Sequence, residues 1–114
     1  MKKYNIQNYI RYKEDVKQSV ARLENKPWSE YTKEELTIKF LPLVENIARK
    51  FATSQQASGV MSIMDMIQSG SLGLTHAVRK LDYEKLKESE DMEKTLKSFF
   101  SKRIKGSIRR QIDS

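Results

Sequence analysis

Apolar residues recur along most of this chain at intervals of three and four positions, which is the spacing of one face of an α-helix. Stretches in which apolar and polar residues alternate, as they do along a half-buried strand, are absent. Only two prolines and four glycines interrupt the helical pattern. We therefore expect an all-α protein that forms a compact helical domain of three to five helices.

The first expected helix covers about residues 5–24. The sequence Asn-Lys-Pro at 25–27 breaks it, because proline cannot continue a helix. Charged residues interrupt the apolar stripe of this helix, which consists of Ile6, Tyr9, Ile10, Val16, Val20 and Leu23.

The second expected helix begins at a capping box, in which the Thr32 hydroxyl and the Glu35 carboxylate each satisfy a backbone amide. It continues to about Phe51. Pro42 lies inside this segment and predicts a kink or a break just before Leu41. The buried face should comprise Leu36, Phe40, Leu43, Val44, Ile47 and Phe51.

A third helix is expected over about 63–81, after a polar loop at 53–59 and an N-cap at Ser62. Gly70 and Gly73 lie inside it, although glycine costs a helix roughly 1 kcal/mol relative to alanine. We interpret both glycines as sites of close approach by a neighbouring helix. A phosphate-binding loop is not indicated, because no strand precedes the glycines and no Gly-Lys-Ser/Thr sequence follows them.

The last helix is expected over about 91–112, after a highly charged connection at 85–91. Ser89 is a suitable N-cap, and Glu90 lies at the positive end of the helix dipole. Apolar residues recur at every fourth position, so the buried stripe winds slowly around the helix. Its members are Leu96, Phe100, Ile104, Ile108 and Ile112.

Lysine and arginine outnumber aspartate and glutamate by 22 to 15, and the net charge is +7. Basic residues crowd the last helix, where no acidic residue occurs from Lys94 to Ile112. Like charges on neighbouring turns destabilise a helix. We therefore expect a polyanionic partner that offsets their repulsion.

Three interpretations of the basic helix differ in what they require. A solvated surface would normally contain glutamates as well. A helix lying on a membrane would need a larger apolar face with tryptophan at its edge, and the only tryptophan, Trp28, is distant. Nucleic acid fits best, because a helix that follows phosphates needs lysine and arginine on one side, with aromatic residues if single strands are stacked, and Phe99 and Phe100 precede the cations by one turn.

No catalytic constellation is found, so we expect a protein that is not an enzyme and that needs no cofactor or metal. His76 is the only histidine, and its place on a helix is typical of a surface residue. The carboxylates from Glu84 to Glu93 are typical of a solvated linker. The chain has no cysteine, no signal peptide and no apolar run near the ~18 residues of a membrane span, so we expect a soluble cytoplasmic protein.

The chain contains three segments in order: LPLVENIARKF at 41–51, MDMIQSGSLGLTHAVRKLD at 64–82 and the basic FFSKRIKGSIRRQI at 99–112. Together they resemble region 2 of the sigma-70 family of bacterial and phage transcription initiation factors. The central segment is the most specific, because few other families place aspartate, glutamine, two glycines and Ala-Val at that spacing. The whole is most similar to the compact late-gene sigma factors of T4-type bacteriophages.

The resemblance divides the chain into a variable N-terminal helical extension at 1–35 and a sigma region 2-like domain at 36–114. Family members continue beyond this region, so we expect a longer parent protein whose C-terminal part is absent here. The implied partners are bacterial core RNA polymerase, through the coiled coil of its β′ subunit, and the −10 element of promoter DNA. A phage coactivator and a sliding clamp are implied as well, in the cytoplasm of the host, with no membrane partner.

In the family the central helix binds the β′ coiled coil. The resemblance therefore implies polymerase-binding roles for Asp65, Gln68, Ser69, Ser71, Leu72 and Thr75. The family often has glutamate at the position of Ser69, so the balance of charge in this contact is expected to differ.

The resemblance implies DNA-binding roles for Arg49, Lys50, Lys97, Phe99, Lys102, Arg103, Lys105, Arg109 and Arg110. Phe99 takes the place of an aromatic residue that stacks on the base flipped out of the −10 element. The tryptophan pair of the family falls on Lys102 and Arg103. The usual apolar wedge for melting DNA is therefore missing.

Two other classes of function remain open. One is a free-standing basic helical module that binds DNA or RNA without a polymerase, and the other is a helical adaptor for an acidic protein. Asp65 and Gln68 favour the sigma interpretation over the first, because a plain binding module has no need of polar residues on the less basic helix.

Overall fold

The computed structural model describes residues 2–53 and 62–113, and of residues 2–6 it describes the backbone alone. Over these residues the chain folds into six α-helices and a short 3-10 helix, with no strand. The expectation of an all-α, compact helical domain is confirmed. The elements are α1 (Lys2–Ala21), η1 (Trp28–Glu30), α2 (Lys33–Lys39), α3 (Leu41–Ala52), α4 (Ile63–Arg79), α5 (Tyr83–Lys87) and α6 (Met92–Asp113). Apart from Thr53, the loop predicted at 53–59 lies outside the described residues.

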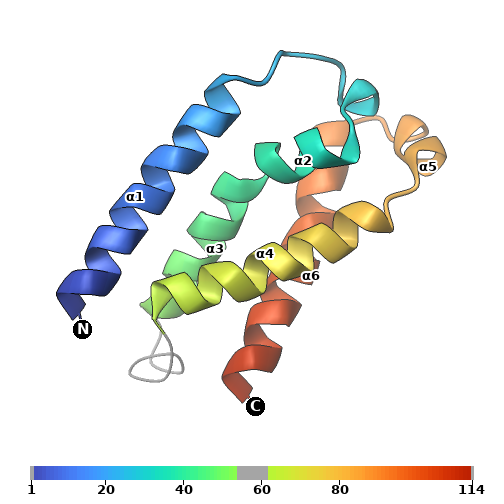
Figure 1. Cartoon of the computed structure of the whole chain (residues 1–114). Coiled ribbons are helices and arrows are strands. Elements are labelled where there is room, and N and C mark those ends of the chain that lie inside the picture. Colours follow the sequence, from blue (N-terminus) through green and yellow to red (C-terminus); the bar gives the residue numbers. More distant parts are fainter. Residues whose placement is uncertain (1, 54–61, 114) are drawn as a thin grey trace.

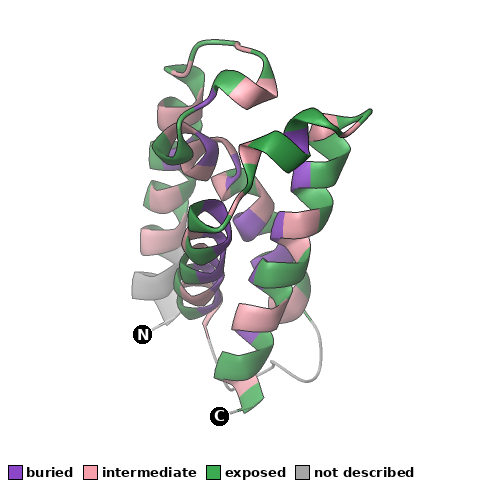
Figure 2. Cartoon of the chain, turned by 90° about the vertical axis from the view of Figure 1, so that its right-hand side faces the viewer, coloured by how far each residue is buried: buried purple, intermediate pink, exposed green. Residues whose placement is uncertain are grey.

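The centre of the fold is the pair α4 and α6, which cross each other and share the largest contact between any two elements (Figure 1). Helix α3 packs against both of them, and α1 lies on the outside against α2, α3 and α4. Figure 2 shows that the buried residues gather between the helices, while the outward sides are exposed. Helices α4 and α6 therefore each have one buried face and one free face.

The apolar stripe predicted for the last helix is buried as expected. Leu96, Phe100, Ile104 and Ile108 are fully buried, and Ile112 is half-buried. The ring of Phe100 packs edge-on against Phe40, with the ring centroids 4.9 Å apart, and so joins α6 to the junction between α2 and α3.

The two glycines of α4 allow close packing, as predicted. A Cβ atom added at Gly73 would lie 2.7 Å from the Cβ of Ser107 and 2.9 Å from the carbonyl oxygen of Arg103. One added at Gly70 would lie 2.9 Å from a methyl carbon of Val44. Real Cβ atoms do not approach other atoms this closely, so a side chain at Gly73 would require α6 to move and one at Gly70 would require the Val44 side chain to move.

The break predicted before Leu41 is confirmed. Phe40 separates α2 from α3 with φ −101° and ψ 5°, and Pro42 follows in the first turn of α3. Proline has no amide hydrogen, so Pro42 cannot donate to the carbonyl of Ile38 and the helix cannot run through.

The capping box is confirmed too, because the Thr32 hydroxyl accepts from the Glu35 amide at 3.1 Å and the Glu35 carboxylate accepts from the Thr32 amide at 2.9 Å.

The charged connection predicted at 85–91 is partly wrong, because α5 occupies its first half. The Asp82 carboxylate caps this short helix and accepts from the amides of Glu84 and Lys85 at 3.0 and 3.4 Å. Leu86 is buried, whereas the residues on either side of it are exposed. A single apolar residue forms no stripe in the sequence, so periodicity could not reveal this helix.

The N-cap of α6 is Asp91 and not Ser89 as predicted. The Asp91 carboxylate accepts from the amide of Lys94 at 3.1 Å. The Ser89 hydroxyl instead donates to the Asp91 carbonyl at 3.2 Å and contacts the hydroxyl of Thr95 at 2.5 Å. Ser89 therefore ties the connection to the first turn of the helix without capping it.

Within the described part of the chain, no helix combines the length and the apolar composition that crossing a membrane demands.

We predict opposite effects of alanine at two helical glycines. Gly73→Ala should lower the free energy of unfolding by about 1–3 kcal/mol, because its Cβ would collide with the backbone of α6. Gly106→Ala is the matched control, since nothing lies within 4 Å of its Cβ position, and it should raise the stability by up to ~1 kcal/mol. Urea denaturation followed by circular dichroism measures both. A stabilising Gly73→Ala would show that α4 and α6 are not in close contact.

Candidate nucleic-acid interface

Helix α6 carries its cations on the side that faces away from the core. Ile104 and Ile108 are fully buried, whereas the basic residues around them are exposed. The exposed cations are Lys102, Arg103, Lys105, Arg109 and Arg110, which we call the basic surface. None of the five forms an ion pair with any described residue. They are therefore free to contact phosphates.

Two aromatic rings flank the basic surface, and each lies under an arginine. The guanidinium of Arg103 is 5.6 Å from the ring centroid of Phe99, one turn earlier on α6. The guanidinium of Arg109 is 5.8 Å from the ring centroid of Phe51, which comes from α3. Both rings are half-buried. Such cation–π contacts keep a guanidinium within about 6 Å of an aromatic ring, and the face of such a ring is also suited to a base.

Lys97 and Arg110 are exposed and make only weak local contacts. The ammonium of Lys97 lies 3.8 Å from the Glu93 carboxylate, and both side chains are more than half exposed. The Nε of Arg110 donates to the Gly106 carbonyl at 3.4 Å. Exposed pairs of this kind contribute little to stability, so neither contact prevents binding to DNA.

Arg49 and Lys50 do not lie on the same side of α3. The Arg49 guanidinium donates to the Glu45 carboxylate at 3.2 Å and to the Asn46 side chain at 2.7 Å, and it faces α1. Lys50 is exposed and directly precedes Phe51, the ring beneath Arg109. Of these two cations, Arg49 is the one held by contacts on the α1 side of α3.

The free face of α4 presents a row of exposed residues, Asp65, Gln68 and Leu72, which we call the α4 row. Their spacing of three and four positions places them on one side of the helix, opposite the two buried glycines. Leu72 is 61% exposed and is one of two large hydrophobic side chains so exposed among the described residues. His76 continues the row and is exposed, as expected of a surface residue.

The other three residues implied in polymerase binding lie at the edges of the α4 row. Ser69, Ser71 and Thr75 are half-buried. The Ser69 carbonyl accepts from the Ser107 hydroxyl of α6 at 2.7 Å, and the Thr75 hydroxyl donates to the Ser71 carbonyl at 2.9 Å. Ser69 therefore contributes to the contact with α6, while Ser71 and Thr75 bond to each other within α4.

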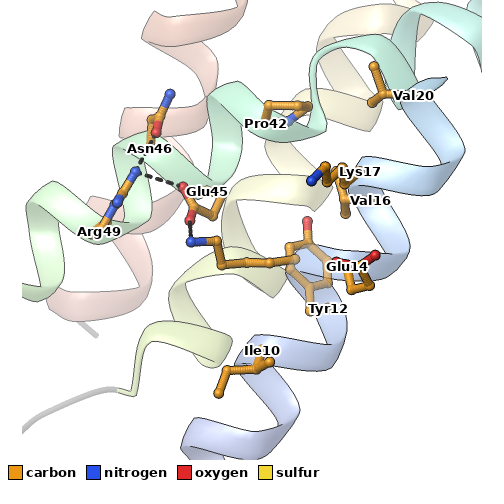
Figure 3. Close-up of a pocket in the computed structure, with 11 residues that line it drawn as sticks. Ile10, Tyr12, Glu14, Val16, Lys17, Val20, Pro42, Glu45, Asn46 and Arg49 are labelled. Atoms are coloured by element: carbon orange, nitrogen blue, oxygen red, sulfur yellow. Dashed lines mark hydrogen bonds and ion pairs between the residues drawn. The ribbon is translucent and has the colours of Figure 1, made fainter.

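A groove of about 630 Å³ between α1 and α3 contains a polar contact that sequence reasoning missed (Figure 3). The Glu45 carboxylate is buried there beside three partners. The Tyr9 hydroxyl donates to it at 2.5 Å, and the Lys13 ammonium and Arg49 guanidinium lie 3.6 and 3.2 Å away. Burial and then this hydrogen bond raise the pKa of Tyr9 to about 12. No local signal marks Glu45, because it is the distant α1 that covers it.

Neither metal ligands nor known relatives point to a function. Over residues 2–53 and 62–113, no three His, Cys, Asp or Glu side chains come together in a way that would bind a metal ion. Comparison with protein-family models, with curated proteins and with solved structures gave no match to this chain. Its function therefore has to be inferred from the basic surface, the α4 row and the resemblance of the motifs.

We predict that Tyr9 makes the attachment of α1 sensitive to alkaline pH. At pH 8, Tyr9→Phe should lower the free energy of unfolding by about 1–2 kcal/mol, because the hydrogen bond to Glu45 is lost. The folded-state pKa is raised, so the contribution of Tyr9 is complete below pH 10 and disappears as the pH rises toward 12. The difference between the two proteins in urea denaturation should therefore shrink across this interval. A difference that stays constant with pH would contradict the contact.

Proposed function

We propose that this chain is a sigma-like transcription initiation factor domain. It binds the core RNA polymerase of a bacterial host and recognises and melts the −10 promoter element, serving the late genes of a phage. The observation that carries the proposal is that one closely packed helix pair has two chemically different free faces. Unpaired cations cover the free face of α6, and a polar row with an exposed leucine covers that of α4.

The α4 row favours a protein partner for this helix. An exposed leucine flanked by a carboxylate and an amide combines apolar area with directional polar groups, as protein interfaces do. Asp65, Gln68 and Leu72 are the residues that the sigma-70 resemblance assigns to the β′ coiled coil. A module that binds only nucleic acid has no use for them.

The basic surface favours DNA as the partner of α6. Among the described residues none of its five cations forms an ion pair, so contact with phosphates releases counterions without breaking ion pairs within the described part of the protein. Lys102 and Arg103, which replace the tryptophan pair of the family, are both exposed. They are suited to holding phosphates and not to wedging bases apart. Melting is therefore expected to depend on Phe99 and on help from a coactivator and a sliding clamp.

A free-standing module that binds DNA or RNA is the second candidate. The unpaired cations of α6 would serve such a module equally well. The α4 row distinguishes the module from a sigma-like domain, because only the latter needs it to bind polymerase. Binding to nucleic acid that is unaffected by changes in the row, together with no binding to polymerase, would favour the module.

We predict that the α4 row binds polymerase. Asp65→Ala and Gln68→Ala should each weaken binding to the isolated β′ coiled coil by about 1–3 kcal/mol, because each removes a polar partner from an interface. The chain should stay folded, since both side chains are exposed. Pull-down and calorimetry against core polymerase and the coiled coil measure this. Glu90→Ala, at another exposed acid, is the matched control, and unchanged affinity in both row variants would refute the docking.

We also predict that the basic surface binds phosphates. Lys105→Gln and Arg110→Gln should each reduce the slope of log affinity against log salt by about 0.7–0.9, because each removes one phosphate contact. The measurement is the affinity of the polymerase complex for a −10 promoter fragment at several salt concentrations. Arg22→Gln removes an exposed cation at the end of α1 and should leave the slope unchanged. Equal slopes in all variants would mean that α6 does not contact the DNA backbone.

A further inference from the structure

Helix α1 carries apolar side chains that the rest of the described chain does not cover. Of the apolar stripe predicted for residues 5–24, Val16 alone is buried among the described members, and Val20 is half-buried. Ile10 is 61% exposed, and Leu72 of the α4 row is the one other large hydrophobic side chain so exposed in the described part of the chain. Apolar side chains gathered on a surface are typical of a place that another molecule covers.

These side chains border the groove between α1 and α3 that Figure 3 shows. The volume of the groove, about 630 Å³, lies within the range of roughly 300–1,000 Å³ that is usual for clefts that bind a ligand. Its apolar residues come from both helices, and we call them the apolar lining. They are Ile10, Val16 and Val20 of α1 and Pro42 of α3.

Three cations at the edge of the groove favour an acidic occupant. They are Lys13 and Lys17 of α1 and Arg49 of α3, and we call them the cationic rim. Lys13 and Arg49 share the single carboxylate of Glu45, at 3.6 and 3.2 Å, and about half of each side chain remains exposed. Lys17 is exposed and forms no ion pair with any described residue. Since Glu14 is the one exposed acid among the residues that line the groove, exposed cations outnumber exposed acids there.

The shape of the groove suits a helix. Residues 10–20 of α1, which form one side, extend over about 15 Å, the length of roughly three helical turns. The lining residues recur at intervals of three and four positions on both sides, at 10, 13, 17 and 20 on α1 and at 42, 46 and 49 on α3. Side chains at this spacing form ridges between which the side chains of a third helix pack.

We propose that this groove binds an amphipathic helix of another protein, whose apolar side chains contact the apolar lining and whose carboxylates face the cationic rim. A helix held in this way is anchored through its residues at i, i+3, i+4 and i+7. A second copy of the chain is a poor occupant, because each copy has a net charge of +7. Nucleic acid is a poor occupant too, because the groove has an apolar lining and contains Glu14 and Glu45. The proposal does not depend on the proposed function.

Fluorescence anisotropy of a labelled synthetic peptide tests the proposal on the full chain. The peptide has about 15 residues, with leucines at i, i+3, i+4 and i+7 and glutamates on both flanks. Ile10→Ser should weaken its binding by about 5- to 50-fold, because apolar contact area is lost. Lys17→Glu should weaken it by about 3- to 10-fold, because an attraction becomes a repulsion. Both side chains are exposed, so the chain should stay folded.

Two matched variants control for binding elsewhere on this basic chain. Leu72→Ser removes an equally exposed hydrophobic side chain, and Lys105→Glu reverses an exposed cation of the basic surface. Both should leave the affinity for the peptide unchanged at physiological salt, where charges more than about 8 Å apart are largely screened. Loss of binding in Lys105→Glu but not in Ile10→Ser would show that the peptide lies on α6 and would refute the proposal. Equal binding of a peptide with lysines in place of the glutamates would refute an acidic occupant.

A direct readout comes from Ile10→Trp in a Trp28→Phe background. The peptide should shift the emission of the new tryptophan to shorter wavelength, because the indole leaves water. A peptide with serines in place of the leucines should not shift it. This variant keeps a large apolar side chain at the position, so it stays informative even if Ile10→Ser unfolds. No shift with either peptide, or the same shift with both, would overturn the proposal.

The remaining outcomes separate this proposal from its alternatives and from the proposed function. A dimer in sedimentation that Ile10→Ser dissociates would assign the groove to a second copy and overturn the proposal. Ile10→Ser should leave binding to the β′ coiled coil and to a −10 promoter fragment unchanged, because Ile10 belongs neither to the α4 row nor to the basic surface. A chain that binds the peptide through Ile10 and Lys17 but binds neither polymerase nor DNA would refute the proposed function and support this proposal.

Discussion

The close packing of α4 on α6 is the constraint on which the rest of the structure depends. Gly73 leaves space for the Arg103 carbonyl and the Ser107 side chain of α6, and Gly70 leaves space for the Val44 side chain of α3. This contact uses the inner face of each helix and leaves the outer face free. The polar row on α4 and the cations on α6 are thereby fixed relative to each other. Any change that separates the two helices would disturb both surfaces at once.

Burial of its apolar stripe allows α6 to carry so much like charge. Leu96, Phe100, Ile104 and Ile108 are fully buried, and burying such a side chain contributes about 1.5–3 kcal/mol. Repulsion between like charges one turn apart costs only a few tenths of a kcal/mol for each pair. The free energy gained by burying the stripe is therefore larger than the free energy lost to repulsion between the cations. The cations remain on the surface without acidic partners, which is the condition that a polyanionic ligand requires.

Helix α1 is attached in a different way from the inner helices. Val16 is its one buried apolar residue among those described and is still 9% exposed, and Ile10 is 61% exposed. The buried Glu45 supplies a polar attachment instead, through Tyr9 and Lys13. The same carboxylate holds Arg49 toward α1. A contact between α1 and α3 thus decides which basic residues of α3 are directed away from the surface of α6.

The sequence by itself determined the all-α class, the capping box at Thr32, the break before Leu41 and the winding stripe of the last helix. Each of these features depends on local periodicity or on the backbone chemistry of a few neighbouring residues, and both can be read from the sequence. It did not reveal α5, because Leu86 is apolar among charges and is buried through the packing of α5 against η1 and α6. The tertiary structure alone decided that Arg109 covers Phe51, since no local rule relates side chains on two helices that are far apart in sequence.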